Sequence, residues 1–553
     1  MFKIVVLFLF LFVSYAYSID YSHCTSCHRI EKIDDVHNFS CTVCHLPKNT
    51  KMPLKSHKPI IKNPSSMEFV DAQCGSCHRA DIDRLKHSLH YTLSSAINIT
   101  RFVWHAQDTV NPIYGVFAQS GLKQIPKPKS IIKKPQDLVD DLLRRKCLRC
   151  HLQNNSYTTA GTHRAKGCAA CHMEYSLSGR YQGSDRLLRG KFGFSKIHRF
   201  NAHPKDSNCL ACHNNEFVGS DYFGMFPQDY HSSFRSPIMP NGYFKRRIFG
   251  IGQHHLLKDV HARAGLMCVD CHKKSDVMGD GRLYIRQLDA VKVSCSDCHG
   301  GYSKKPNPSY VRKTPLGYMM RLVNGRVVDV VQFNPNTQAH KYHKNLHCSA
   351  CHAAWQSEHF QLNLYLDKTK NYSMWKDLIY QEDPYLERFL RRALRDGSLL
   401  PLMPDYISGK LEEGIWYSGW LARRWSYFVL LKDKNGKYYI GRPLFQYRLT
   451  YKDKNGKLVF DDVDNMSAIM PFVPHTISKC PKGCAQCHEN PYMRYKDWQS
   501  GTAAAEFFKG ETLFGYRPKP NWMDSKLYRR VMFERMRGFI KQTYKEELKG
   551  ESN

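Results

Sequence analysis

The sequence predicts a mostly α-helical and irregular fold that carries one small antiparallel β insertion, at about residues 425–462. Two observations favour this class. Short Cys-x-x-Cys-His segments recur ten times, and each fits a single helical turn rather than a long element. Near the end of the chain, two Asp-Lys-Asn-Gly-Lys turns are flanked by β-rich runs, which is the strongest hairpin pattern that a short sequence offers.

The first eighteen residues form a segment of their own. Lys3 gives a basic start, residues 4–13 are continuously apolar, and Ala16 to Ser18 supply small residues at the spacing of a cleavage site. This pattern indicates a secretory signal peptide over 1–18, so we expect an exported protein that does not span the membrane once the signal is removed. The alternative is a short membrane anchor that stays uncleaved.

Cysteine usage carries most of the information in this chain. Of 21 cysteines, 20 fall into the ten Cys-x-x-Cys-His motifs. The cysteine pairs are Cys24 and Cys27, Cys41 and Cys44, Cys74 and Cys77, Cys147 and Cys150, Cys168 and Cys171, Cys209 and Cys212, Cys268 and Cys271, Cys295 and Cys298, Cys348 and Cys351, and Cys484 and Cys487. The histidines that follow them are His28, His45, His78, His151, His172, His213, His272, His299, His352 and His488.

This spacing fits the covalent attachment of haem. Two thiols three positions apart on a helical turn reach the two vinyl groups of one porphyrin, and the next residue places an imidazole beside the iron. A structural zinc site needs no histidine directly after each pair, and a thioredoxin-type pair would occur once. Ten copies therefore predict about ten covalent haem c groups, with iron held by the ten motif histidines.

On these motifs the chain resembles the multihaem c-type cytochromes of bacterial respiration, and the resemblance extends over nearly all of the expected mature chain. The segments around His261 to His272, Asp276 to Gly281 and Pro474 to Thr476 are similar to parts of large octahaem and decahaem members. The resemblance implies a polypeptide wrapped around a stack of haems, where the cofactors replace much of the apolar core.

The charge balance fits the same interpretation. The formal net charge is +33, and ten haems would add two propionates each, leaving roughly +12 after loss of Lys3 with ferrous iron. Lysine and arginine are therefore expected to pair with propionates. Export argues against nucleic acid as a partner.

A second axial ligand for most irons is expected among the 18 histidines outside the motifs. Two imidazoles give a six-coordinate iron that exchanges electrons readily and offers no open position to a substrate. Several of these histidines lie just upstream of a motif, where related chains often carry a ligand for a neighbouring haem. The strongest candidates are His37, His90, His163, His198, His203, His261, His343 and His475.

The motifs are unevenly spaced, which divides the chain into expected regions. The Pro/Lys-rich stretch near residue 125 is typical of a linker, and the last motif follows some 130 residues without any. The expected regions are a signal peptide at 1–18, a three-haem region at 19–121, a linker and short helix at 122–146, a six-haem region at 147–352, a haem-free helix and hairpin insertion at 353–479, and the last haem with a C-terminal helix at 480–553.

Individual elements follow from local patterns. A short helix is expected from Pro135 to Arg145, and another after Asp383, where proline at the first helical position and Gly397 mark its limits. The two Asn-Gly turns predict hairpins that pair 427–432 with 438–441 and 446–452 with 458–461. Asn324-Gly325 predicts a further hairpin, and residues 524–548 read as a charged amphipathic helix.

The leading functional hypothesis is electron transfer, since every motif ends in histidine. Expected partners are other redox proteins: cytochromes, a quinol-oxidising complex or an outer-membrane conduit, in the periplasm or at the outer membrane or cell surface. The alternative is a multihaem oxidoreductase of nitrogen or sulfur compounds in which one iron lacks a distal ligand, as the hydroxylamine-oxidising family implies. A homo-oligomer or cytochrome filament is a third reading.

Cys480 is the one cysteine outside the motifs, four residues before Cys484. The plainest interpretation is a free thiol. An intermolecular disulfide, or a thiolate that takes part in sulfur chemistry near the last haem, is the alternative.

Overall fold

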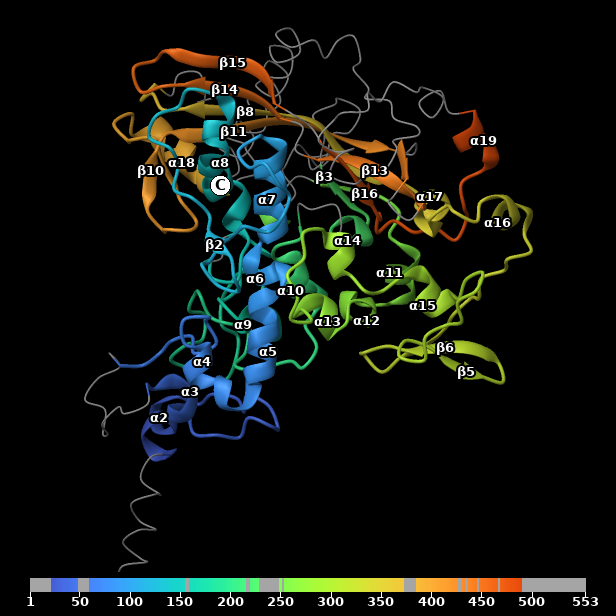
Figure 1. Ribbon diagram of the computed structural model, residues 1–553. Coiled ribbons are helices and arrows are strands. Elements are labelled where there is room, and N and C mark those ends of the chain that lie inside the picture. Colours follow the sequence, from blue (N-terminus) through green and yellow to red (C-terminus); the bar gives the residue numbers. More distant parts are fainter. Residues whose placement is uncertain are drawn as a thin grey trace, which may run out of the picture. The chain divides into compact units, whose positions relative to one another are not determined.

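The computed structural model describes eleven stretches of the chain. They are residues 21–47, 59–154, 159–214, 219–227, 248–250, 253–371, 384–425, 429–432, 436–444, 447–465 and 468–489. The expected signal peptide at 1–18 and the expected helix at 524–548 lie outside them. The described residues form helices and several small sheets rather than a single structural class (Figure 1).

The chain divides into two compact units, and neither is continuous in sequence. Unit 1 contains 1–83 and 152–211, and unit 2 contains 84–151 and 212–553. This division differs from the expected regions, because the boundary falls inside a helix of the expected three-haem region. In unit 1 the side chains of Asn63 and Ser65 bond to the carbonyl of Lys166, 2.9 and 3.4 Å away, which joins its two segments.

Unit 1 is built from short helices joined by irregular chain. They are α2 (Tyr21–Cys27), α3 (Cys41–His45), α4 (Val70–Gln73), the first part of α5 (Gly75–His87), α9 (Ala169–His172) and α10 (Asp206–Leu210). Most span one or two turns, which is too short to be stable alone in water. Their stability must therefore come from tertiary contacts with the surrounding irregular chain.

The helices of unit 2 are also short, with two exceptions. The two longer ones are α7 (Ser94–Val103) and α18 (Pro384–Arg395), the second of which confirms the helix expected after Asp383. The others are α6 (Leu89–Thr92), α8 (Val139–Arg145), α11 (Val260–Ala264), α12 (Cys268–Cys271), α13 (Lys274–Val277), α14 (Gln287–Ala290), α15 (Cys295–His299), α16 (Gln338–Tyr342), α17 (Cys348–His352) and α19 (Cys484–His488).

The β structure also lies in unit 2 and is larger than expected. Four short pairs or triplets come from β1 (Tyr114–Gly115), β2 (Lys123–Gln124), β3 (Met225–Pro227), β4 (Gln253–His255), β5 (Arg312–Thr314), β6 (Gly317–Arg321), β7 (Val327–Asp329), β9 (Leu402–Pro404) and β10 (Leu411–Glu413). Two longer sheets come from β8 (Gln356–Asp367), β11 (Ile415–Trp425), β12 (Val429–Lys432), β13 (Tyr438–Leu444), β14 (Tyr447–Lys452), β15 (Leu458–Asn465) and β16 (Ala468–Phe472).

Both predicted hairpins of the insertion are confirmed, but their sheets extend beyond 425–462. β12 pairs with β13 and β14 pairs with β15, each antiparallel. The four-stranded sheet has the order β11-β8-β14-β15, and β14 runs parallel to β8 with Leu449 beside Leu364. The expectation of a purely antiparallel insertion was therefore wrong. The hairpin at Asn324-Gly325 is confirmed as β6–β7.

A buried apolar cluster holds the four-stranded sheet against α7, α8 and α18. Ile97 of α7, Leu142 of α8, Trp416 of β11 and Leu386 of α18 are each no more than 1% exposed and belong to this cluster. The same elements lie together in Figure 1. The cluster also includes Ile125, so the stretch 122–146, which we expected to be a linker and short helix, contributes to the core of unit 2.

Candidate metal centres

The Cys-x-x-Cys-His motifs form single helical turns. In four of them the backbone N–H of the histidine donates to the carbonyl of the first cysteine at 2.9 Å, which closes the turn from one end of the motif to the other. The aspartate inside two motifs helps to begin the helix: Asp270 accepts from the N–H of Met267 and Asp297 from that of Ser294. The helical turn places both sulfurs beside the histidine.

All twenty motif cysteines lie at least partly exposed and carry no disulfide. Neighbouring motifs nevertheless approach one another. In unit 1, burial and then the thiol of Cys209 raise the pKa of Cys171 to about 12. In unit 2, burial and then the thiol of Cys298 raise the pKa of Cys271 to about 12. These thiols are therefore neutral at ordinary pH, and successive motifs are packed close together.

Six motif histidines each face one histidine from outside the motifs. The separations of the ring centres fall between 5.9 and 6.1 Å. In unit 1 the pairs are His78 with His37 and His45 with His198. In unit 2 they are His213 with His90, His299 with His261, His272 with His475, and His488 with His343. Each pair joins one motif histidine to one of the eight predicted distal candidates.

The spacing within the pairs fits one metal ion held between two imidazoles. A first-row metal ion lies about 2.0 Å from an imidazole nitrogen that ligates it, and the ring centre is about 1.2 Å further back, so two axial rings should have centres roughly 6.3 Å apart. Aromatic rings that pack against each other without a metal also lie roughly 4.5–7 Å apart, so the notable feature is that six motif histidines each face another imidazole at nearly the same distance. The observed separations differ from the axial value by less than half an ångström.

Hydrogen bonds orient many of these rings through Nδ1. The Nδ1 atoms of His45, His90 and His343 lie 2.8, 3.0 and 2.8 Å from the carbonyl oxygens of Ile61, Val277 and Ala339. A backbone carbonyl can only accept, so each Nδ1 carries the proton and Nε2 is the nitrogen left for a metal. His172 and His299 have the same arrangement with the carbonyls of Asn201 and Val331.

In three histidines the Nδ1 partner is a carboxylate instead. His28 bonds to Asp185 at 2.8 Å, His37 to Asp34 at 2.7 Å and His261 to Asp259 at 2.8 Å. Burial alone would raise the pKa of Asp34 and of Asp185, but the hydrogen bonds that these carboxylates accept hold both values below the usual range. Two of the three carboxylates are nearly inaccessible: the side chain of Asp185 is 0% exposed and that of Asp259 is 2% exposed.

Burial keeps several of the paired rings neutral. Burial, followed by the neighbouring His213, lowers the pKa of His90 to about 4, and burial with the neighbouring His272 does the same for His475. The pKa values of His198 and His213 are lowered as well, chiefly by burial. A neutral imidazole is also the form that can ligate a metal ion.

The fourth motif has a different geometry. It forms a 3-10 turn at Cys147–Arg149 rather than an α-helical one. The ring of His151 lies 5.9 Å from that of Phe117, and its Nε2 lies 3.1 Å from the carbonyl of Tyr406. In His151 the Nε2 atom thus faces a backbone carbonyl, and His151, like His28, His172 and His352, is outside the six pairs.

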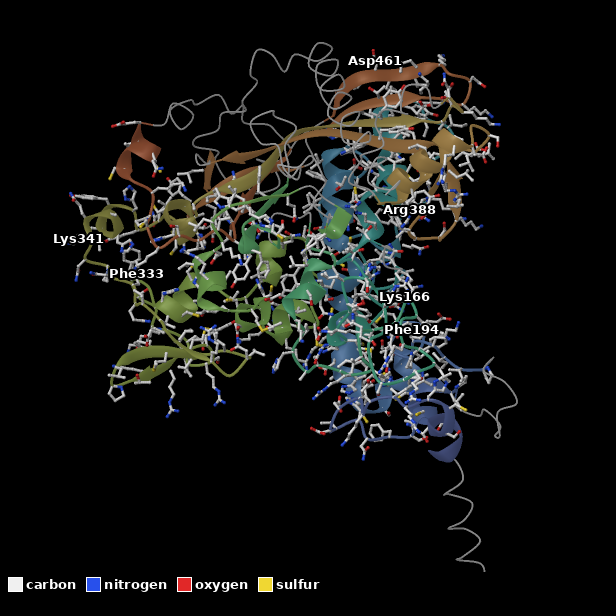
Figure 2. The ribbon with its side chains drawn as sticks, turned by 180° about the vertical axis from the view of Figure 1, so that it is seen from behind. Lys166, Phe194, Phe333, Lys341, Arg388 and Asp461 are labelled. Carbon is white, nitrogen blue, oxygen red and sulfur yellow. The ribbon has the colours of Figure 1, made fainter. Side chains whose placement is uncertain are left out.

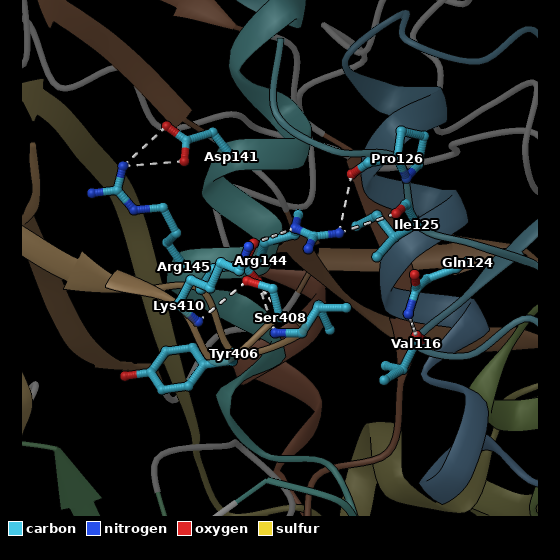
Figure 3. Close-up of polar contacts among 12 residues, drawn as sticks. Val116, Gln124, Ile125, Pro126, Asp141, Arg144, Arg145, Tyr406, Ser408 and Lys410 are labelled. Carbon is cyan, nitrogen blue, oxygen red and sulfur yellow. Dashed lines mark hydrogen bonds and ion pairs between the residues drawn. The ribbon is translucent and has the colours of Figure 1, made fainter. Parts of the chain in front are cut away.

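Buried ion pairs hold the chain next to this fourth motif. Arg144 donates to Asp405 at 2.7 Å and also to the carbonyls of Ile125 and Pro126 (Figure 3). Arg145 pairs with Asp141 at 3.2 Å, and both arginine side chains are at most 5% exposed. Because a buried charge without a partner is costly, these contacts fix α8 and the segment of Tyr406 in one arrangement.

Two predicted distal ligands are not brought to a motif histidine within the described stretches. His163 packs its ring 5.0 Å from that of Phe192, and His203 is exposed. Conversely, His340 was not among the eight strongest candidates, yet it lies near His352: burial lowers the pKa of His352, a hydrogen bond at Ser478 opposes this, and His340 adds to the lowering. Its ring packs 4.4 Å from Phe333, which Figure 2 labels. One sequence feature could have pointed to His340: it lies three residues before His343, upstream of the same motif.

Among the described residues, no three side chains of His, Cys, Asp or Glu converge as a metal site. In the same stretches we find no helix with the length and apolar character needed to cross a lipid bilayer. Comparison with protein-family models, with curated proteins and with solved structures found no match for this chain.

Proposed function

We propose that this protein is an exported multihaem c-type cytochrome that transfers electrons through about ten covalently bound haems, most of them ligated by two histidines. The six histidine pairs are the observation that carries the proposal. Each pair supplies only two donors, which is too few for an isolated metal ion but the number that a porphyrin iron needs.

Each part of a motif has a definite role in this proposal. The two cysteines form thioethers that hold the cofactor, and the motif histidine supplies the proximal nitrogen. The facing histidine, such as His475 opposite His272, supplies the distal nitrogen. When bound, haem supplies an iron that accepts and releases one electron. The chain keeps this iron six-coordinate, which favours electron transfer over substrate binding.

The packing of successive motifs supports a route for electrons within each unit. In unit 2, the thiols of Cys295 in the eighth motif and Cys348 in the ninth share a hydrogen bond. Cys351 of the ninth motif lies close enough to Cys487 of the tenth for their thiols to interact. In unit 1, Cys168 neighbours Cys74 in the same way. Cofactors attached at such neighbouring sulfurs would lie close enough to exchange electrons.

Charge and export support the choice of partners. A net charge of +33 is balanced in part by propionates and otherwise suits contact with acidic redox proteins. We propose that other cytochromes, a quinol-oxidising complex or an outer-membrane conduit exchange electrons with this chain in the periplasm or at the outer membrane.

The test is an intact-mass measurement on full-length protein produced in a host that attaches haem to exported chains. The expected result is the mass of the mature polypeptide plus about ten haems. The matched variant C484S/C487S removes one motif and should lose one haem mass. Bare polypeptide in both preparations would overturn the proposal.

A second candidate function draws on the fourth motif, where the ring of His151 faces a carbonyl instead of another imidazole. An iron there with a different axial environment would suit an oxidoreductase of nitrogen or sulfur compounds. The spectrum of the ferric protein separates the two functions. Low-spin signals alone favour electron transfer, and a high-spin signal of one haem favours catalysis.

A further inference from the structure

Three carboxylates that accept a hydrogen bond from Nδ1 of a candidate axial histidine set those sites apart from the others, while Asp276 and Asp81 lie farther from His272 and His78, at 3.5 and 3.9 Å. At most orienting contacts the partner of Nδ1 is a backbone carbonyl, as for His45, His90 and His343. At His28, His37 and His261 it is Asp185, Asp34 or Asp259. The distances are similar, between 2.7 and 3.0 Å, so what differs is the full negative charge on the acceptor.

The backbone around each carboxylate stabilises this charge. Asp34 accepts from the N–H groups of Val36 and His37 at 2.8 and 2.6 Å. Asp185 accepts from the N–H of Leu187 at 2.8 Å. These donors are fixed by the chain and favour the ionised form of each side chain.

Asp259 is the most constrained of the three. One oxygen accepts from both the N–H and the Nδ1 of His261, and the other accepts from the N–H of Ile477 at 2.6 Å. The same aspartate therefore begins α11, orients the ring and anchors the segment that carries His475. Its side chain is 2% exposed, so solvent screens its charge weakly.

A carboxylate on Nδ1–H makes an imidazole a stronger electron donor to its metal than a neutral carbonyl does. A stronger donor stabilises ferric more than ferrous iron and so lowers the reduction potential of the site. The couple concerned takes up one electron at the iron. The electron comes from a neighbouring site or from the electrode used to measure the potential.

We infer that Asp34, Asp185 and Asp259 are positioning residues that hold the sites of the third, first and eighth motifs at lower reduction potentials than sites whose histidines donate only to carbonyls. This inference rests on the proposed function. In unit 2 it places the site of His299 and His261 below that of His213 and His90, where the Nδ1 acceptor is the carbonyl of Val277. In unit 1 it places the sites of His28 and His78 below that of His45.

The inference has a consequence for the resting distribution of electrons. A partly reduced protein holds its electrons on the carbonyl-type sites, and the carboxylate-type sites are reduced last. The effect of removing the charge should be larger at Asp185, whose side chain is 0% exposed, than at Asp34, whose side chain is 23% exposed.

The test uses Asp34→Asn beside Asp35→Asn in the full-length, haem-loaded protein. Asn keeps the turn in which one side-chain oxygen accepts from backbone N–H groups, but its Nδ2 replaces the oxygen that accepts from His37, so D34N removes the charge and the acceptor for Nδ1 with little change in the fold. Asp35 is the matched control: it loses the same charge one residue away, its side chain is 97% exposed, and it pairs with Lys32 instead of a histidine. Asp185→Asn is the second test, for a buried site.

The measurement is an equilibrium redox titration followed by visible absorbance, together with low-temperature EPR of the ferric protein. In D34N, one of the ten steps should move to a higher potential, with roughly a tenfold change in its ferric-to-ferrous ratio, about 59 mV for one electron. In D185N, the potential of a different step should rise by more than the step that moves in D34N. In D35N, no step should shift in potential by a comparable amount. The g values of one low-spin signal should change with each moved step.

Two outcomes separate the inference from the proposed function. Variants that carry all ten haems by mass, with titration curves and EPR signals equal to the wild type, would overturn the inference and leave the proposed function standing. Protein without haem in the wild type would overturn both. If D185N does not fold, D34N and D35N alone decide the matter.

Discussion

Axial histidines are the residues on which the proposed function depends, and His343 is the one best suited to a test. Its ring centre lies 5.9 Å from that of His488, and both side chains lie at the surface or close to it, so truncation should not disturb a core. In H343A one iron should lose its sixth ligand, so that one haem in ten becomes high-spin in the ferric spectrum.

H203A is the control, because His203 is exposed and contacts no motif histidine ring in the described part of the chain. It should leave the spectrum unchanged. A low-spin spectrum in H343A equal to that of the wild type would contradict this pairing.

Glu31 ties the N-terminal segment of unit 1 to the chain near Ser184 and gives a pH-dependent prediction. Partial burial raises the pKa of Glu31, but hydrogen bonds from the hydroxyl of Tyr181 and from the backbone and hydroxyl of Ser184 outweigh it and lower the pKa to about 2. A carboxyl with a depressed pKa stabilises the folded state above its ordinary pKa, and this contribution is lost as the pH falls from about 4.5 towards 2.

In E31Q we therefore expect stability at pH 6 to fall by about 1 kcal/mol, after allowance for solvent screening, and the difference from the wild type to shrink at pH 3. Thermal unfolding at the two pH values measures both. The exposed Glu68 provides the control E68Q. An E31Q deficit that is equal at pH 3 and pH 6 would contradict the role of this carboxylate.

At the scale of elements, the hairpin turns depend on single glycines. Gly456 has φ +82° in the turn between β14 and β15, a region that a residue with a Cβ adopts at a cost of about 1 kcal/mol or more. G456A should therefore lower stability by about that amount, although no atom lies within 4 Å of the added carbon.

The matched control is G397A, because Gly397 also has open space around it but no left-handed φ. Chemical denaturation of the two variants compares them directly. Equal stability of both variants would show that the backbone conformation of Gly456 carries no cost.

The sequence predicted those elements whose information is local. The Asn-Gly turns, the proline that begins α18 and the helical turn of each motif depend on neighbouring residues, and the structure has them where the pattern indicated. The parallel pairing of β14 with β8 joins residues about eighty positions apart, and nothing in either strand indicates the other. The sheet therefore extends further than the pattern predicted.

The same limit applies to the candidate sites. Counting histidines showed that the chain has enough ring ligands, and six of the eight strongest candidates face a motif histidine. Which ring faces which motif is a tertiary property: His198, just upstream of the sixth motif, faces His45 of the second. The carboxylate partners were not predicted, because an Asp near a His in sequence has no fixed geometry.

For the whole molecule, stabilising contacts are distributed unevenly between the apolar cluster of unit 2 and the motif turns. In unit 2 the apolar cluster of α7, α8, α18 and the four-stranded sheet can pack without a cofactor. The motif turns, four or five residues long, cannot. Chain produced without haem attachment should therefore keep slow hydrogen exchange in α7, α8, β8 and β11, and exchange rapidly in the motif turns.

Haem attachment should then slow exchange in the motif turns by at least about tenfold, or about 1.4 kcal/mol. Hydrogen-exchange mass spectrometry of both forms measures this. As the internal control, peptides from α7 should change little between the two forms. Equal protection of the motif turns with and without haem would contradict this distribution of stability.

The long reach of β8 has a consequence for how the protein matures. This strand begins four residues after the histidine of the ninth motif, and its neighbours β11 and β14 are synthesised much later. Sheets that depend on such distant segments close slowly. If the chain is exported and loaded with haem as we propose, this delay gives the attachment enzymes time to reach the cysteines of the preceding motifs while the chain around them is still open. The order of synthesis would then place cofactor loading ahead of sheet closure.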